Sequence, residues 1–585
     1  VLVVKSSALY ATGLQAEAVN KGGSLLKVVS HRPVPRGFLA IAGGSGIINI
    51  PHDNTGLNLP NPFANSMQGM LTLPQFIDKK STNRNSFWKS TSFDGIAAVG
   101  AVLDAQFGNT PLTTPLQDDD GTSNVTYRFP FSQHIEDIKV PVLITYPIAG
   151  GGCIKPINGW PVVIFQHGIT SDRTASLGFA NAMAAVSTGC FATVAMDLPT
   201  HGLDASTTDR NGAATRYPAF NAFNVAGYVD ANPLVTPFAS TLAGLAESEV
   251  TTYVGLAERH ENIALNSAQK IVPMSFVAGE ESGNSGDMFI NLTNFQQTRD
   301  HIRQAVMDML NLNASIGGMD IDGGGDGDLD ENNIHFVGHS LGAITGLTFA
   351  AVNNSIASND AIVDKAVKPL KTIVLASPGG QLSKLLENSS SFSAKMLPGL
   401  SASLGLTQGM IDLEKYYNVF QASIDSADSV NFTELLQSSN TPVLMFEIVG
   451  GGAVSAIDSN NDPMAGKVTG LPDSLIAIGG YPADTVVPNN ANPALNGVET
   501  GLSYLAGTTP LIGLLELADV TASIAPAADQ LMLVSQLKEG THGTISSADA
   551  VTVFAEMIGQ AASFFATEGR GLVVTDVDQL QIPVN

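Results

Sequence analysis

The sequence is poor in charged residues and in cysteine, and it has no long apolar run. Charged residues make up 14% of its 585 residues, and 28 Lys and Arg against 53 Asp and Glu give a net charge of −25. A chain this acidic would be repelled by phosphate backbones, which argues against a nucleic-acid partner. No uninterrupted apolar stretch reaches the roughly 18 residues of a membrane-spanning helix, so we expect no transmembrane segment.

Cysteine occurs only twice, as Cys153 and Cys190. Two cysteines without a nearby histidine pair do not make a zinc ligand set. Cys153 precedes an apolar strand-like run at 161–166, and Cys190 opens another at 191–196. If these runs are neighbouring parallel strands, both cysteines lie near the same edge of a sheet. We predict a disulfide between them in a secreted protein, with two buried free thiols as the alternative.

Strand-like and helix-like segments alternate along most of the chain. The strand-like runs are at 140–146, 161–166, 191–196, 334–337, 371–376, 442–449 and 531–535, and the helix-like runs are at 174–188, 295–312, 343–351 and 548–566. This order predicts an α/β fold in which helices cover both faces of a mostly parallel central sheet. We expect it to form a catalytic domain at 121–585, after an N-terminal region at 1–120 whose role the sequence does not indicate.

Three regions depart from this alternation. The N-terminal region is rich in Gly, Asn, Pro and Ser, with short strand-like runs at 46–51 and 56–60, which predict a smaller β-containing part. The segments 200–290 and 489–530 interrupt the order of strands and helices, the second with a helix-like run at 511–517. Each of these two segments is a candidate cap or lid over a site, and the alternative for each is an insertion that takes no part in catalysis.

Ser340 has the most informative surroundings of any residue in the chain. It is the centre of Gly338-His339-Ser340-Leu341-Gly342, a G-x-S-x-G motif between the strand-like run 334–337 and the helix-like run 343–351. A serine at a sharp strand-to-helix turn needs small neighbours, and the following helix N-terminus favours a nearby anion. With 58 glycines a chance match is the alternative, but the strand-then-helix context favours a nucleophile.

A serine hydroxyl needs a base to accept its proton, and that base is nearly always a histidine. The chain has ten histidines, and His542 is the only one beyond Ser340. It follows the last strand-like run, in Gly540-Thr541-His542-Gly543. In the chain order nucleophile, acid, histidine, His542 therefore has no competitor, and a surface-loop histidine is the alternative.

The acid that orients the histidine should lie between them in the sequence. The candidates after the run 442–449 are Asp458, Asp462, Asp473 and Asp484. Asp458 and Asp462 lie in a polar stretch that is typical of a solvated turn. Asp484 is followed at once by Thr485-Val486-Val487-Pro488, so it has the apolar neighbours of a buried acid. We predict Asp484, with Asp473 as the second choice.

An oxyanion formed on the substrate needs backbone N–H donors. One should be the N–H of Leu341, directly after the nucleophile, and the other should come from the loop after the run 161–166. In that loop Gly168 permits a tight turn, which would direct the N–H of Ile169 into the site. We interpret the neighbouring His167 as a structural loop histidine.

The segment 320–331 is an acidic loop that resembles a calcium-binding loop. Counted from Asp320, position 12 is Glu331 and position 6 is a glycine, as an EF-hand loop requires, but position 5 is Gly324 and offers no side-chain ligand. A calcium site would use Asp320, Asp322, Asp326, Asp328 and Glu331. A solvated acidic turn is the alternative that the sequence favours.

Taken together, the motifs resemble those of α/β-hydrolase lipases. The matching segments are 166–168, 196–202, 299–304, 338–342, 484–488 and 540–543. More narrowly, the chain resembles the large extracellular virulence-factor lipases and surface lysophospholipases of Gram-negative bacteria, over residues 120 to 570 and loosely in the N-terminal region, although the first forty residues depart from the pattern. The resemblance implies a hydrolase of lipid esters that is secreted or held at the outer cell surface.

These observations lead to one expected activity and several alternatives. We expect a serine carboxylic-ester hydrolase, a lipase, that uses Ser340, His542 and Asp484 and requires no organic cofactor. A lysophospholipase or phospholipase comes second. A peptidase or polyester depolymerase would use the same groups, and a surface-binding protein would keep the fold without catalysis. The sequence does not indicate acyl-chain preference, head group or oligomeric state.

Overall fold

The computed structural model describes most of the chain from residue 130 onward and shorter parts before it. The described residues are 33–43, 46–47, 49–51, 63–77, 86–90, 116–119, 121–126, 130–148, 151–203, 256–261, 263–265, 270–274, 283–360, 362, 365–451, 481–490, 503–547 and 550–582. Among them, no helix combines the length and the apolar composition needed to cross a membrane.

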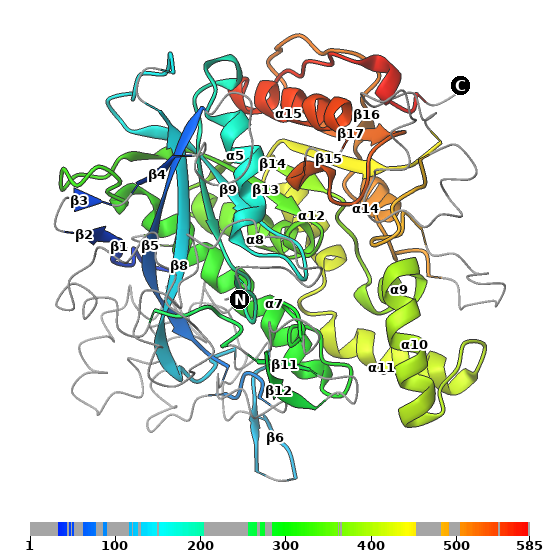
Figure 1. Cartoon of the computed structure of the whole chain (residues 1–585). Helices are drawn as coiled ribbons and strands as arrows, with labels where there is room; N and C mark the ends of the chain where they lie inside the picture. The colour runs from blue at the N-terminus through cyan, green and yellow to red at the C-terminus, as the bar shows by residue number, and fades with distance from the viewer. Residues whose placement is uncertain are drawn as a thin grey trace.

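A single large sheet organises the described part of the chain (Figure 1). Its strand order is β1-β5-β8-β10-β9-β13-β14-β15-β17-β16, and β4 also pairs with β5. The strands are β1 (Phe38–Ala40), β4 (Asn49–Pro51), β5 (Ala64–Gln75), β8 (Glu136–Pro147), β9 (Trp160–Gln166), β10 (Ala192–Met196), β13 (Leu329–His339), β14 (Leu370–Ala376), β15 (Val443–Ile448), β16 (Ala518–Asp519) and β17 (Met532–Leu537). All pairs from β10 to β16 are parallel, whereas β8, β5, β1 and β4 are joined by antiparallel pairing. The predicted α/β fold with a mostly parallel sheet is confirmed.

Alternate residues of the parallel strands point to opposite faces of the sheet, and each face has its own apolar core. In β9, Val162 and Ile164 belong to one core, and Val163 and Phe165 belong to the other. The first core packs against α7 (Phe295–Ser315) and α8 (Leu341–Ser358), and the second against α5 (Leu177–Met183) and α15 (Val551–Ala566). The continuous apolar runs that predicted these strands therefore reflect burial on both faces.

Further helices lie outside these two layers. Between β14 and β15 the chain forms α9 (Leu382–Asn388), α10 (Ser390–Leu404), α11 (Ile411–Ile424) and α12 (Thr433–Ser438), and α14 (Thr509–Leu514) precedes β16. In Figure 1, α9, α10 and α11 form a group beside the sheet, below β15 and α14. The helices α9 to α12 were not predicted from the sequence, and they lie outside the two candidate lid segments, 200–290 and 489–530.

The predicted helix at 174–188 is wrong as a continuous helix. The chain forms a 3₁₀ turn at Arg173–Ser176, the short α5, and a second 3₁₀ turn at Val186–Thr188. Ala185 has an extended backbone, with φ −72° and ψ 148°, which interrupts the helix. The other predicted helices are present with shifted ends.

The N-terminal region contributes to the same sheet. β5 pairs with β8 over twelve residue positions, from Ala64 opposite Pro147 to Gln75 opposite Glu136. The sheet therefore contains strands from both sides of the expected boundary at residue 120. Of the short runs expected there, 46–51 contains β3 (Gly46–Ile47) and β4, and 56–60 lies outside the described residues. The division of the chain into two domains stays a prediction.

Of the two expected lid segments, only parts are described. Within 200–290, β11 (Ile263–Leu265) pairs with β12 (Ile271–Pro273). Within 489–530, α14 leads to β16, which pairs with β17. Part of the second segment is thus a strand of the central sheet, and a lid role for either segment stays a prediction.

Candidate active site

Ser340 occupies a sharp turn between the end of β13 and the start of α8. Its backbone has a positive φ of 55° with ψ −121°, a strained conformation for a residue with a side chain. A Cβ atom on Gly338 would lie 2.5 Å from the carbonyl oxygen of Gly342, and one on Gly342 would overlap the carbonyl oxygens of Gln166 and His167. The glycines of the motif are therefore required by close backbone approach, as the sequence predicted.

Backbone hydrogen bonds hold this turn in place. The N–H of Ser340 donates to the Ala376 carbonyl at 2.9 Å, and the Ser340 carbonyl accepts from Ala343 and Ile344 at 2.8 and 2.9 Å. These bonds place Ser340 where the carboxyl ends of β13 and β14 meet. Parallel strands carry their sites at this edge of an α/β sheet.

His542 lies in the loop between β17 and α15 and is paired with Asp484. Its Nδ1 lies 2.7 Å from Asp484 Oδ2. Because a carboxylate only accepts hydrogen bonds, Nδ1 is the donor, and in a neutral ring Nε2 then carries the lone pair. This is the tautomer that a general base needs.

His339, the residue before Ser340, contacts His542. The Nε2 of His339 lies 2.7 Å from the His542 carbonyl oxygen, and the centroids of the two imidazole rings are 4.9 Å apart. Within the described part of the chain no hydrogen bond joins Ser340 Oγ to the His542 ring.

Asp484 has the surroundings of a buried, ionised carboxylate. Its side chain is 1% exposed, and its Oδ1 accepts from the N–H groups of Val486 and Val487 at 2.8 and 3.0 Å. Burial alone would raise its pKa, but the charge and hydrogen bond of His542, the Val486 N–H and the Ser377 hydroxyl hold it below the usual value. The rival candidates Asp458, Asp462 and Asp473 lie outside the described residues.

The loop after β9 packs directly against the serine. A Cβ on Gly168 would lie 2.9 Å from Ser340 Cβ and 3.3 Å from His339 Nδ1. Within the described residues, the N–H groups of Ile169 and Leu341 donate to no acceptor. Leu341 is the first residue of α8, where N–H groups have no intrahelical partner. Both predicted oxyanion donors are thus uncommitted and lie on the two segments that meet at Ser340.

His167 is a structural residue, as expected. It is fully buried, its Nδ1 lies 2.7 Å from the Gly168 carbonyl oxygen, and its Nε2 accepts the N–H of Leu198 at 3.1 Å. Burial lowers its pKa, which keeps the ring neutral. Both ring nitrogens are thus used to hold the loop against the end of β10.

Only part of the acidic loop forms a group of carboxylates. Oxygens of Asp320, Asp322 and Asp328 lie within 4.8 Å of one another, and Lys155 pairs with Asp322 at 3.0 Å and with Asp328. Backbone N–H groups also donate to all three, for example Gly323 to Asp320 Oδ1 at 2.6 Å. The predicted fourth and fifth ligands, Asp326 and Glu331, are not part of this group within the described residues, and Glu331 pairs with Lys368 instead. Calcium binding at this loop stays a prediction.

The two cysteines are joined. Cys153 and Cys190 form a disulfide with a Cα–Cα distance of 5.7 Å. Both precede their strands, β9 and β10, so the bond lies at the amino ends of these strands, away from Ser340. The expected disulfide is present, and the described residues contain no free cysteine.

Two features of the surroundings were missed by the sequence analysis. His339, at the position before the serine where the motif allows any residue, contacts the His542 carbonyl oxygen. Ser377, just after β14, hydrogen-bonds Asp484. A histidine inside the motif is a visible signal for the first. Nothing local marks Ser377, because its contact joins strands that are distant in sequence.

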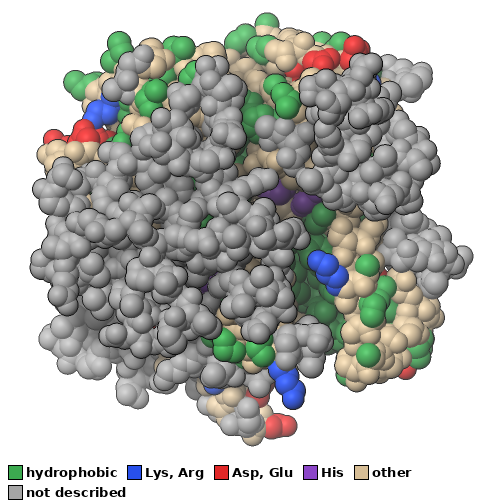
Figure 2. Space-filling model, viewed as in Figure 1, with side chains coloured by type: hydrophobic (Ala, Val, Ile, Leu, Met, Phe, Trp, Pro, Cys, Tyr) green, Lys and Arg blue, Asp and Glu red, His purple; other side chains and the backbone are tan. Residues whose placement is uncertain are grey.

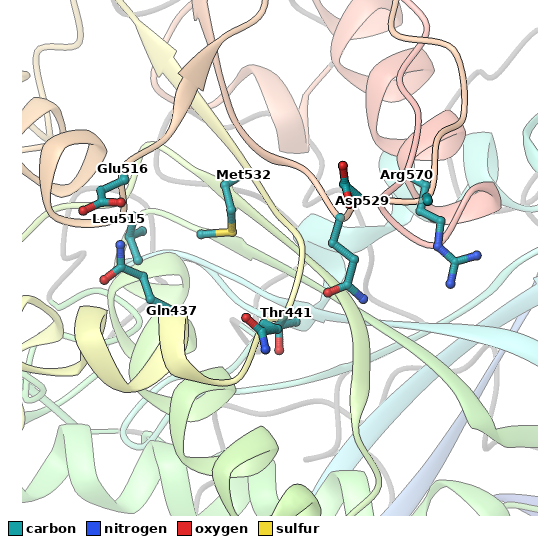
Figure 3. Close-up of a pocket in the computed structure, with 10 residues that line it drawn as sticks. Gln437, Thr441, Leu515, Glu516, Asp529, Met532 and Arg570 are labelled. Atoms are coloured by element: carbon teal, nitrogen blue, oxygen red, sulfur yellow. The ribbon is translucent and has the colours of Figure 1, made fainter.

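The surface above this region is hollowed. Figure 2 shows histidine side chains in a hollow, with hydrophobic side chains and a Lys or Arg side chain below them. A separate cavity of about 600 Å³ lies at the opposite, amino ends of β15 and β17 and is lined by Gln437, Thr441, Asp529, Met532 and Arg570 among others (Figure 3). Its mixed polar lining contains neither Ser340 nor His542.

The described residues thus form an α/β fold with a mostly parallel central sheet and a serine at a strand-to-helix turn. No protein-family model matches the chain, and no curated protein is similar to it. Solved structures to which it is similar include an esterase from Pyrobaculum calidifontis, with 12% identity, coverage of 74% of this chain and 82% of that chain, and a TM-score of 0.27. Another is Est1E from Butyrivibrio proteoclasticus, with 12% identity, coverage of 53% of this chain and 73% of that chain, and a TM-score of 0.21. A third is acetyl xylan esterase 1 from Thermoanaerobacterium sp. JW/SL YS485, with 13% identity, coverage of 57% and 68%, and a TM-score of 0.25. Similarity at this level does not indicate an activity.

Proposed function

We propose that the protein is a serine carboxylic-ester hydrolase that cleaves fatty-acyl esters. The observation that carries the proposal is the hydrogen-bonded pair of His542 and Asp484, which lies beside the strained turn of Ser340. A serine, an oriented histidine and a buried carboxylate in this chain order are the groups that acyl transfer requires.

In this mechanism Ser340 Oγ attacks the ester carbonyl carbon while His542 Nε2 accepts the hydroxyl proton. The N–H groups of Ile169 and Leu341 stabilise the oxyanion of the tetrahedral intermediate. The intermediate collapses, His542 returns the proton to the leaving alcohol, and an acyl-enzyme remains. Water, deprotonated by His542, then attacks the acyl-enzyme and releases the fatty acid. Asp484 stays ionised and stabilises the imidazolium that forms at each step.

A nearly uncharged segment that begins next to the site supports an apolar substrate. α10 begins next to the Asp484 loop, where the N–H of Ser391 donates to the Thr485 carbonyl at 3.0 Å. In a chain with a net charge of −25, residues 388–411 contain one lysine and no acidic residue. At the far end of α10 and just beyond it, Leu404, Met410 and Ile411 are 56%, 41% and 71% exposed. Such a surface favours lipid esters over short polar ones, and the resemblance to lipases points the same way.

The disulfide supports a place outside the reducing cytosol, because such bonds persist in oxidising compartments. We propose that the protein is secreted or held at the outer surface of a Gram-negative bacterium. This location is also what the resemblance implies.

A fluorophosphonate probe tests the catalytic proposal. Wild type should be labelled, Ser340→Ala should not, and Ser358→Ala, at the far end of α8, should be labelled like wild type. A wild-type protein that folds but is never labelled would support a non-catalytic binding protein. Hydrolysis of triacylglycerol compared with lysophosphatidylcholine then decides between lipase and lysophospholipase.

A further inference from the structure

A fully buried group of polar and charged side chains lies directly behind the loop that carries Ile169. We call it the Arg173 cluster, and its members are Arg173, Asp197, Glu258 and Gln68. All four are 5% exposed or less, and Arg173, Asp197 and Glu258 are at 0%, 1% and 0%. None of the four belongs to the proposed catalytic groups.

Every N–H of the Arg173 guanidinium is used within this cluster. Its Nη1 donates to Asp197 Oδ2 and, at 2.7 Å, to Glu258 Oε2. Its Nη2 donates to Glu258 Oε1 at 2.8 Å and to Gln68 Oε1 at 3.0 Å, and its Nε donates to the same Gln68 oxygen at 3.2 Å. A guanidinium has five donors in a rigid plane, so these bonds fix its orientation completely.

The cluster joins four segments that are distant in sequence. Gln68 is in β5, Arg173 follows the loop after β9, Asp197 follows β10, and Glu258 is in the segment 256–261. The backbone is tied as well, because the N–H of Arg173 donates to Asp197 Oδ1 at 2.6 Å and the N–H of Leu203 donates to Glu258 at 3.0 Å.

The loop that follows β9 is therefore held at both ends by the last residue of β10 and the residues just after it. At its start, Gln166 Nε2 donates to the Met196 carbonyl at 3.1 Å, and His167 accepts from Leu198. At its end, Arg173 is held by Asp197. Ile169 lies between these two attachments, and the adjoining Gly168 packs against Ser340.

The energetics of burial favour a geometric role for Arg173. Burying charges costs several kcal/mol per ion, and well-packed apolar residues of similar volume are often equally stable. Burial would lower the pKa of Arg173, but Glu258 and Asp197 raise it, so the guanidinium remains charged. Preorganised donors in an oxyanion hole must be held in position before the reaction begins.

We propose that Arg173 is a positioning residue for the oxyanion hole, which it serves by fixing the loop that presents the Ile169 N–H beside Ser340. This inference rests on the proposed hydrolase function. Arg173 acts only through the loop and through Asp197 and Glu258, and does not touch the substrate.

The test compares Arg173→Lys, Arg173→Met and the charge-balanced double variant Arg173→Met/Glu258→Met. The double variant removes one positive and one negative charge, and Asp197 keeps the backbone N–H of residue 173 as a donor, which limits the damage to the fold. The control is Arg303→Met, which breaks an ion pair of α7 with Asp300 on another part of the molecule. Active sites are counted by exhaustive fluorophosphonate labelling, and kcat, KM and inhibition by a boronic acid are measured on a soluble nitrophenyl ester.

If Arg173 positions the oxyanion hole, kcat per active site falls about 10- to 100-fold in the double variant, while KM changes little. Affinity for the boronic acid, which forms a tetrahedral adduct, falls by a similar factor. Arg173→Lys recovers part of the loss, and Arg303→Met shows none of it. An unchanged kcat per active site in the double variant would overturn the inference and leave the hydrolase function standing. A folded wild type that is neither labelled nor active would overturn both.

Discussion

A Cβ atom placed on Gly168 would lie 2.9 Å from the Cβ of Ser340. This is closer than two carbon atoms in contact normally come, since their optimal separation is about 3.5–4.0 Å. The loop after β9 and the serine turn are thus packed without spare room. The absence of a side chain at residue 168 is a condition for the geometry of the whole candidate site.

Gly168→Ala should therefore reduce activity far more than stability. The added methyl group must move either the Ile169 loop or Ser340, and we expect kcat/KM on a soluble ester to fall about 100-fold or more. The free energy of unfolding should fall by about 1–3 kcal/mol. Gly559→Ala in α15, where a Cβ would meet nothing within 4 Å, is the matched control and should stabilise the protein slightly. Full activity in Gly168→Ala would show that this loop does not form the oxyanion hole.

Asp484→Asn should lower kcat about 10⁴-fold with little change in KM. The amide can donate to His542 Nδ1, which favours the tautomer that cannot act as base toward Ser340. Glu556→Gln serves as control, because Glu556 in α15 is also buried but accepts hydrogen bonds from Gln560 and Thr575. If both variants lose activity equally, or if Asp484→Asn keeps most of it, the acid has been assigned wrongly.

His335 should make the protein less stable as the pH falls. Burial and the charge of Lys371 lower its pKa to about 3, whereas an unfolded histidine has a pKa of about 6.5. Between these values the unfolded chain binds a proton that the folded protein does not. The free energy of unfolding should therefore fall with decreasing pH, by about 1.4 kcal/mol per pH unit for this residue.

Urea denaturation between pH 7 and pH 4 measures this dependence. His335→Phe should show a shallower decline than wild type. Phe191→Leu, which removes a ring packed 5.4 Å from His335, should lower stability without changing the slope. Equal slopes for wild type and His335→Phe would mean that His335 is protonated in the folded protein.

Loss of the disulfide should reduce stability without reducing turnover. The bond closes a loop over a sequence separation of 37 residues, which corresponds to about 4 kcal/mol of free energy of unfolding. The paired variant Cys153→Ser/Cys190→Ser should unfold at lower urea but keep the wild-type kcat at 25 °C, because the bond lies at the strand ends opposite Ser340. A loss of kcat in the folded variant would contradict this separation.

Lys155 should compete with any cation at the acidic loop. Its ammonium already pairs with Asp322 and Asp328, so chelation should leave the Tm of wild type unchanged. In Lys155→Met the three carboxylates face one another, and added calcium should raise the Tm by binding to the folded state. A fall in wild-type Tm on chelation would instead indicate a native metal site.

The sequence predicted the elements whose signals are local. Strands β9, β13 and β14 are buried on both faces, so they require continuous apolar runs. The backbone passes close to other segments at the Ser340 turn, so the turn requires glycines. His542 was selected because no other histidine follows Ser340. For each of these, a few neighbouring residues carry the physical requirement.

What the sequence did not predict depends on contacts between distant segments. β5 contains Gly69 and Pro74 and lacks a run of β-branched residues, and it is a strand because twelve positions pair with β8. α10 contains Pro398 inside the helix, which weakens any helical signal. Arg173 gave no signal of its role, since its partners come from three other segments of the chain.

The ladder between β5 and β8 also determines which fragments of the chain can be handled in solution. A recombinant fragment that starts after residue 120 would lack β5 and would leave β8 as a bare sheet edge along twelve positions. Unpaired edges of this length promote association between molecules. Material for crystallisation or inhibitor screening should therefore retain the strands that precede residue 120.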